Sequence, residues 1–503
     1  MSAILHDLAL GFSVALTPSV LIYSLVGCIV GTLVGVLPGL GPLAGISLLL
    51  PMTLGLPPTT AIVMLAGIYY GAMYGGSTTS ILMRIPGESA SVVTCLDGYE
   101  MARKGRAGPA LAIAAIGSFV AGTISVVALS LVAPQIARYA LNFGPAEYVG
   151  LLTLALLLLA QLGSGSKVRS LVMSLLGLAL GMIGIDPLTG YARFTLGIPA
   201  LADGLGIVPL AVGLFGISEI LLSAGTRNVP KVAAPRLRDL YPSRAELSAS
   251  TMPCLRGTVL GFVIGLIPGS AHIISSFISY ALERKLSRTP ERFGKGAVEG
   301  LAGPESANNA AAVSAFVPML ALGLPAGAIP AVMLAALMAH GISPGPRLIQ
   351  EQPQLYWGFV ASMYVGNLVL LLLNLPLVSL FVSVLRIPYA ILYPIVTTMC
   401  VVGVYSISSS VTDLWIMFAA GIAGYFLRRA NYDVAPVVLG FVLAPMFEVS
   451  LRQALTISSG SLWIFIERPI AATLLGTAFV LVLLSLWMPI SRRLELRRTK
   501  AGD

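Results

Sequence analysis

Residues 35–42 read GVLPGLGP, and residues 265–272 read GLIPGSAH. Both stretches place a Pro-Gly pair inside a long apolar segment. Pro lacks a backbone N–H group and Gly has little backbone restraint, so each pair interrupts a helix. At membrane depth, a broken helix persists only where it is buried in protein or lines a watery cavity. We therefore expect two broken-helix hairpins whose tips have a functional role.

The composition around these hairpins indicates a membrane protein. Hydrophobic residues make up 57% of the 503 positions and charged residues 10%, whereas a soluble protein is about one quarter charged. Apolar runs such as 110–133 and 205–223 cross, or nearly cross, a hydrocarbon core that needs ~20 helical residues. These runs are apolar all round, which is not the alternating pattern of a membrane barrel. The prediction is an all-α polytopic membrane protein, and the alternative is a soluble bundle of buried helices.

The basic residues and the cysteines exclude several other classes. The net charge is +9, but Lys and Arg concentrate in a few short loops and in the tail at 491–500, as the positive-inside rule requires. Nucleic-acid binding is therefore not indicated. The four cysteines are far apart in or beside apolar segments and lack disulfide or metal-ligand spacing. The N-terminus has no basic region of the kind that begins a secretory signal peptide.

The chain resembles itself beyond the two tips. ILMRIPGES at 81–89 matches MLALGLPAG at 319–327, and the serine-rich break at 163–166 matches the one at 406–410. The predicted organisation begins with a first membrane repeat at 1–225, whose hairpin is at about 22–56. A cytoplasmic polar linker at 226–253 leads to a second membrane repeat at 254–450, whose hairpin is at about 257–283. A C-terminal transmembrane helix at 451–490 and a basic cytoplasmic tail at 491–503 follow.

The distribution of basic residues predicts that the two repeats are inverted. The loop at 101–108 carries three basic residues, whereas its counterpart at 340–354 carries only Arg347. The linker at 226–256 is strongly basic and is therefore expected in the cytoplasm. A hairpin plus about five transmembrane helices per unit places the second unit in the opposite orientation, as in many secondary transporters.

The hairpin tips provide the first candidate binding residues. Short helices are expected to begin just after the breaks, at about Leu43 and Ala271. Their free N–H groups and positive dipole ends suit a carboxylate. The alternatives are that Ser270 caps its own helix, that the glycines serve helix packing, and that the histidine is structural. The substrate-binding candidates at the tips are Pro38, Gly39, Leu40, Gly41, Pro268, Gly269, Ser270 and His272.

Two polar tracts inside apolar sequence provide the remaining candidates. In YYGAMYGGSTTS at 69–80, we expect a break at Gly75-Gly76 before three hydroxyl residues. In GPESANNAAA at 303–312, Glu305 and two asparagines share one helical face. Such groups are costly in lipid unless they pair or line a path, so either substrate or ion contact or interhelical hydrogen bonding explains them. The candidates are Ser77, Thr78, Thr79, Asn308 and Asn309, and Na⁺ is expected near Gly39, Ser77, Thr79 and Asn308.

Other acidic residues lie close to apolar sequence. Glu88 and Asp97 follow the Pro86-Gly87 break, where interface exposure and proton relay are the alternatives. Glu219 and Glu448 occupy matching positions near the unit ends, and we expect them to be paired or at the interface. The sequence has no phosphate-binding loop and no HExxH, CxxC or G-x-S-x-G motif. It therefore predicts a protein that is not an enzyme, with no cofactor, and that takes its energy from an ion gradient or a partner.

Several long blocks resemble a known family. GTLVGVLPGLGP, AGIYYGAMYGGSTTS, FGKGAVEGLAGPESANNAAA and HGISPGPRL are similar to conserved blocks of the large transmembrane subunit of tripartite tricarboxylate transporters. The resemblance covers nearly the whole chain. It implies a multi-pass protein of the bacterial inner membrane that works with a small four-helix membrane subunit and a periplasmic solute-binding protein. It also implies carboxylate uptake by symport with Na⁺ or H⁺.

The resemblance also has departures. Many relatives read PGAGA where this chain has PGSAH at 268–272, and APEAANN where it has GPESANN at 303–309. Citrate is therefore not assumed as the substrate. The overall expectation is a secondary active transporter for small tri- or dicarboxylates, with a homodimer as one assembly. The hairpins favour an elevator movement over rocking, and the alternative function is a channel or a passive scaffold for another transport component.

Overall fold

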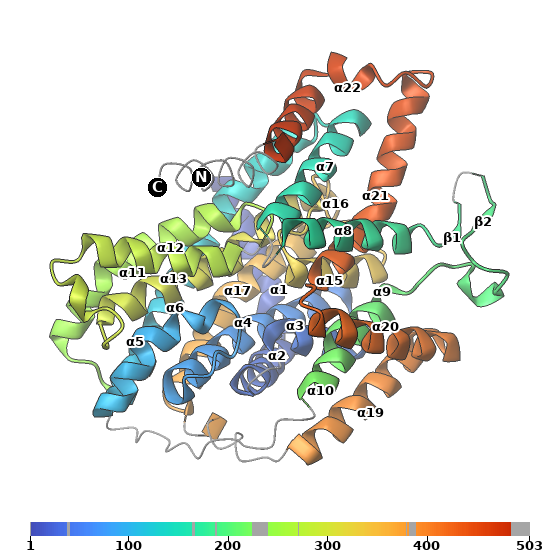
Figure 1. Ribbon diagram of the computed structural model, residues 1–503. Coiled ribbons are helices and arrows are strands. Elements are labelled where there is room, and N and C mark those ends of the chain that lie inside the picture. The colour runs from blue at the N-terminus through green and yellow to red at the C-terminus, as the bar shows by residue number, and fades with distance from the viewer. Residues whose placement is uncertain are drawn as a thin grey trace, which may run out of the picture.

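The computed structural model describes residues 2–37, 41–162, 166–186, 189–223, 240–269, 271–378, 380–381 and 389–483. Regular structure in this part of the chain is almost entirely helical (Figure 1). Six helices are long and apolar enough to cross a membrane: Pro18–Val36, Thr94–Ala140, Arg244–Gly265, Pro353–Asn374, Val411–Arg429 and Ala435–Ile457. The predicted all-α membrane class is therefore confirmed.

The first half of the chain begins with one helix before the predicted hairpin. Its helices are α1 (Ser2–Ala15), α2 (Pro18–Val36), α3 (Gly41–Thr53), α4 (Pro58–Met83), α5 (Thr94–Met101), α6 (Ala107–Ala140), α7 (Pro145–Leu162), α8 (Lys167–Gly181), α9 (Ile207–Ala211) and α10 (Ser218–Ser223). A π-helical stretch, Val212–Ile217, joins α9 to α10. Two short antiparallel strands, β1 (Gly184–Ile185) and β2 (Ala192–Arg193), form a hairpin that projects beyond the helices (Figure 1).

The second half repeats much of this order. Its helices are α11 (Arg244–Gly265), α12 (Ala271–Leu286), α13 (Val298–Ser314), α14 (Phe316–Leu322), α15 (Ala328–Ala339), α16 (Leu348–Glu351), α17 (Pro353–Asn374), α19 (Tyr389–Ser408), α20 (Val411–Arg429), α21 (Ala435–Ile457) and α22 (Ile464–Glu467). A further apolar helix, Pro469–Leu483, lies where the C-terminal transmembrane helix is predicted. The predicted basic tail lies outside the described residues.

Small residues determine the closest helix pair in each half. Glycines every four residues let α2 approach the backbone of α4, and the same spacing lets α11 approach α13. A Cβ atom added to Gly31 would collide with the carbonyl oxygen of Ile68, and one added to Gly261 would collide with that of Ala307. Close backbone approach of this kind is how small residues drive helix association in membranes.

One long helix from each half packs against the other half. The first-half helix α6 packs on α13 and α11, and the second-half helix α17 packs on α4 and α2. In the sequence repeat, α6 corresponds to α17. The pair α2 and α4 corresponds to the pair α11 and α13. The same pairwise packing thus occurs twice, while the inverted orientation stays a prediction.

Two details differ from the expectations. Helix α4 runs unbroken through Gly75-Gly76, so the predicted break there is wrong. These glycines serve packing, because a Cβ atom on Gly75 would meet the backbone of α2 at Thr32. Helix α11 begins at Arg244, so part of the predicted linker is helical, and Ser243 caps it through a reciprocal hydrogen bond with Glu246.

Candidate functional site

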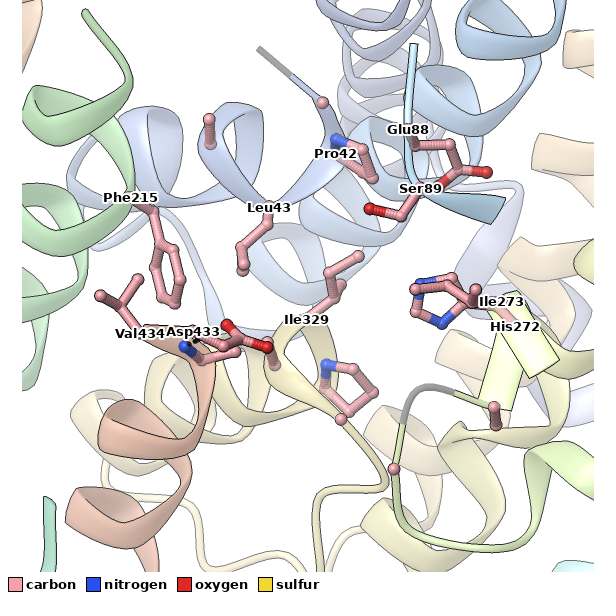
Figure 2. Close-up of a pocket in the computed structure, with 18 of the residues that line it drawn as sticks. Pro42, Leu43, Glu88, Ser89, Phe215, His272, Ile273, Ile329, Asp433 and Val434 are labelled. Carbon is pink, nitrogen blue, oxygen red and sulfur yellow. Dashed lines mark hydrogen bonds between the residues drawn. The ribbon is translucent and has the colours of Figure 1, made fainter. Parts of the chain in front are cut away.

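A cavity of about 820 Å³ lies where the chain breaks of both halves meet (Figure 2). Its wall contains the beginnings of α3 and α12 and the non-helical segments that follow α4 and α14. Residues from the loop between α20 and α21 complete the wall opposite. Figure 2 shows Glu88 and Ser89 near Pro42 on one side, with Asp433 and Val434 near Phe215 on another.

The first hairpin tip reaches this cavity through Gly41. Helix α2 ends at Val36, Leu37 is extended, and α3 begins at Gly41 with a φ angle of +62°. Only glycine adopts that left-handed conformation without a steric penalty. A Cβ atom on Gly41 would lie 3.6 Å from the carbonyl oxygen of Gly87, so the tip adjoins the break after α4. The candidates Pro38, Gly39 and Leu40 lie outside the described residues.

The second tip has the matching arrangement. The Gly269 N–H group donates to the carbonyl oxygen of Ala326 at 2.8 Å, which ties the tip to the break after α14. A Cβ atom on Gly327 would lie 3.3 Å from the carbonyl oxygen of Gly269. Gly269 and His272 line the cavity, whereas Pro268 is in the tip but is not part of the wall. Ser270 lies outside the described residues.

Three helices begin at the cavity. Helices α3, α12 and α15 contribute their first residues, Gly41, Ala271 and Ala328, to the wall. The first N–H groups of a helix have no intrahelical partner and carry partial positive charge. Helix N-termini from both halves therefore converge on one space, which is an arrangement suited to an anion.

Charged groups on the far wall are paired. The Arg428 guanidinium donates to Glu219 at 2.5 Å, and the Asp433 carboxylate accepts from the backbone N–H of Ala435 at 2.9 Å. At the corresponding position of the second half, Glu448 accepts from Arg193 at 2.6 Å. The expected pairing of Glu219 and Glu448 is therefore confirmed. The sequence did not indicate that the Arg428 pair lies at the cavity, because only tertiary packing brings α20 there.

Most residues of the polar tracts that the sequence singled out lie behind the cavity wall, although Tyr69 and Ala311 line the cavity. Ser77 donates to Glu305 Oε2 at 2.7 Å, and Thr94 donates to the other carboxylate oxygen of Glu305. Thr79 donates to the carbonyl oxygen of Val36 at 2.9 Å, and Thr78 bonds back within α4. These contacts hold α2, α4, α5 and α13 together.

The two asparagines of α13 lie in the same buried layer. Asn309 donates to the Ser118 hydroxyl at 2.7 Å, which links α13 to α6. Asn308 donates from Nδ2 to Glu88 Oε1 at 2.7 Å. Glu88 itself is part of the cavity wall. Of the residues in the two polar tracts, Asn308 is thus joined to the cavity through one hydrogen bond.

Comparison with known proteins assigns the chain to a family. A family model described as the tripartite tricarboxylate transporter TctA family matches residues 21–439, a range that includes both tips and the far wall. The chain belongs to this family. Members of the TctA family are membrane components of transporters, so the fold and the cavity belong to a transport protein.

Two similar proteins come from Agrobacterium vitis. One, an uncharacterized 52.8 kDa protein in the TAR-I ttuC' 3'region, is 48% identical over 486 residues, covering 97% of each chain. The other, from the TAR-II ttuC' 3'region, is 48% identical over 226 residues, covering 45% of this chain and 93% of its own length. No solved structure matches the chain.

Proposed function

We propose that this chain is the membrane-spanning subunit of a binding-protein-dependent secondary transporter that imports small tri- or dicarboxylates with an ion gradient. The observation that carries the proposal is the convergence of broken helices from both halves on one cavity. Three helices begin at this cavity, and the free main-chain N–H groups of a helix N-terminus favour an anion. Related arrangements of discontinuous helices hold substrates near the membrane midplane in other secondary transporters.

The size of the cavity fits the proposed substrate class. Binding sites for small molecules enclose about 300–1,000 Å³, and this cavity is about 820 Å³. A carboxylate with two or three charged groups could contact helix ends from both halves at once. With such shared contact, a movement of the contacted elements relative to one another would change the site.

We infer that the cavity opens toward the cytoplasm in this conformation. The wall residue Asn431 is exposed and lies two residues after Arg429, which follows Arg428. Ser89, also exposed, lies on the wall before the basic loop at 101–108. Basic loops favour the cytoplasmic side, so both exposed parts of the wall belong to that side. This assignment rests on the inverted-repeat topology and on a cytoplasmic C-terminus in the inner membrane.

The family name supports the proposed partners. A tripartite system implies further components, and we propose a small four-helix membrane subunit and a periplasmic solute-binding protein. The coupling ion is proposed to be Na⁺ or H⁺. Delivery by a binding protein would place the first step of substrate selection outside this chain.

Filling the cavity tests the proposal. Ala328 begins α15 at the wall and is only half-buried, so Ala328→Trp occupies cavity space without displacing core side chains. Uptake of labelled citrate and succinate by cells expressing all three components should fall about tenfold or more, because each 1.4 kcal/mol of lost binding is a factor of ten. The half-buried Ala472, in the C-terminal helix away from the cavity, provides the control Ala472→Trp. Equal uptake by both variants would contradict the proposed site.

Counterflow separates a carrier from the alternative of a channel or passive scaffold. Proteoliposomes loaded with unlabelled substrate should accumulate labelled substrate transiently if the protein is a carrier. A channel would show no stimulation by substrate on the opposite side.

A further inference from the structure

Two buried glutamates near the cavity differ in the number of hydrogen bonds that their carboxylate oxygens accept. Glu305 is 1% exposed, and each of its oxygens accepts a hydroxyl hydrogen bond, from Ser77 and from Thr94. Glu88 is 9% exposed, and its carboxylate accepts from Asn308 at Oε1. Glu88 Oε2 is buried and has no hydrogen-bond partner among the described residues.

Asn308, the hydrogen-bond partner of Glu88, also has one side-chain oxygen without a donor. Asn308 is 1% exposed, and its Oδ1 atom is also buried without a hydrogen-bond partner in the described part of the chain. The pair therefore makes one amide-to-carboxylate hydrogen bond and leaves two acceptor oxygens unsatisfied. A buried acceptor without a donor costs about 1–3 kcal/mol, and more when it carries charge. A positively charged species at these oxygens would remove that cost.

In the described part of the chain, no cationic side chain pairs with Glu88 Oε2. Arg428, on the same cavity wall, pairs with Glu219, and Arg84, four residues before Glu88, lies over the ring of Tyr99. The titratable groups that interact electrostatically with Glu88 are Tyr69 from α4 and Glu305 from α13, and His272 from α12 lines the same cavity. A buried carboxylate next to a second carboxylate is strongly destabilised unless a cation or a proton compensates it.

We propose that Glu88 and Asn308 form the site of the coupling cation, which is a proton on Glu88 Oε2 or a Na⁺ ion held by Oε2 and Asn308 Oδ1. A protonated carboxyl can donate to the amide oxygen while it accepts from the amide N–H, so both groups are then satisfied. The same two oxygens are the hard ligands that a metal cation such as Na⁺ takes in proteins. The inference rests on the proposed function and adds the position of the cation to it.

The place of Glu88 explains how cation binding and carboxylate binding are coupled. Glu88 lies on the wall of the proposed substrate cavity, directly after Gly87, which adjoins the first tip. When ionised and unoccupied, its charge repels a carboxylate in the cavity. A bound cation removes this repulsion, so cation and substrate each increase the affinity for the other.

Infrared difference spectroscopy on the purified full chain tests the site without a transport substrate. One series varies pH at constant Na⁺, and the other varies Na⁺ at constant pH. If a proton is bound, a protonated-carboxyl band should disappear as pH rises; if Na⁺ is bound, a carboxylate band should shift with Na⁺ at constant pH. Either signal should be absent in Glu88→Gln and present in Glu305→Gln, the matched control. A signal that persists unchanged in Glu88→Gln would overturn the proposal.

Transport separates this inference from the function on which it rests. In proteoliposomes with the membrane complex and labelled citrate or succinate, Glu88→Gln should lose gradient-driven accumulation about tenfold or more relative to the wild-type protein. Wild-type protein without counterflow would contradict the proposed function and leave the spectroscopic result standing. Gradient-driven accumulation by Glu88→Gln at the wild-type level would refute the cation site alone.

A second variant covers the case in which Glu88→Gln does not insert. Asn308→Ala removes the charge-assisted hydrogen bond to Glu88 and one oxygen ligand. The pH or the Na⁺ concentration at half-maximal spectral change should then shift about tenfold, as expected from a hydrogen bond to a charged group. An unchanged midpoint would count against the site.

Discussion

At the residue scale, Asp97 shows how one buried carboxylate positions the start of a helix beside the cavity. Its Oδ1 atom accepts from the backbone N–H groups of Gly296 and Ala297, both at 2.7 Å, and its Oδ2 atom accepts from the Tyr280 hydroxyl at 3.0 Å. These N–H groups precede α13 and have no helical partner. Asp97 therefore joins α5 to α12 and α13, and its role is structural.

Loss of Asp97 should destabilise the protein more than loss of its side-chain partner. Asp97→Ala leaves the buried N–H group of Ala297 and the half-buried N–H group of Gly296 unsatisfied, so we expect it to cost about 3 kcal/mol. Tyr280→Phe removes a single hydroxyl and should cost about 1 kcal/mol. Thermal unfolding of the purified variants in detergent measures both. A midpoint for Asp97→Ala at or above that of Tyr280→Phe would contradict this ranking.

The sequence could locate some site residues but not others. Pro-Gly pairs in apolar sequence identified Gly41 and Gly269 at the cavity, because the cost of a broken helix is a local property. The hydroxyls around Ser77 did not distinguish a binding role from a structural one, since a polar group in lipid is stabilised equally by an ion or by a hydrogen bond to a neighbouring helix. Arg428 lies at the cavity wall because of packing between helices that are far apart in the sequence, and no local sequence pattern predicts such packing.

At the element scale, glycine spacing sets the distance between α2 and α4 and between α11 and α13. Gly261→Leu should prevent stable insertion, because its side chain would meet the backbone of α13 at Ala307. Gly476 in the C-terminal helix provides the control, since no atom lies within 4 Å of its added Cβ position. The membrane yield should fall and the gel-filtration peak should disappear for Gly261→Leu. Both should stay at the wild-type level for Gly476→Leu. Normal yield for both variants would contradict the close backbone contact between α11 and α13.

The sequence predicted the membrane helices correctly but was wrong about one of the helix breaks. Long apolar runs correctly predicted membrane helices, since their length is set by the bilayer. The break expected at Gly75-Gly76 was wrong, because glycine permits a kink and close packing equally well. Helix α4 does end just before Pro86-Gly87, where proline also removes a hydrogen bond, whereas α13 continues through Gly303-Pro304.

At the scale of the whole molecule, the inverted orientation predicts which loops are accessible from each side. Leu196, 88% exposed in the loop that carries the β1–β2 hairpin, is expected in the periplasm, and the exposed Arg288 after α12 is expected in the cytoplasm. Leu196→Cys should react with a membrane-impermeant thiol reagent in intact spheroplasts. Arg288→Cys should react only after permeabilisation. Labelling of both from the outside would contradict the inverted topology.

The central claim is that a carboxylate occupies the cavity between the two hairpin tips. Thiol labelling of Ala328→Cys, with Cys28, Cys95, Cys254 and Cys400 replaced by Ala, tests it most directly, and Ala472→Cys serves as the reference. Saturating citrate or succinate should slow the reaction at position 328 severalfold and leave the reaction at position 472 unchanged. Labelling at position 328 that no carboxylate transported by the complex can slow would show that the substrate binds elsewhere.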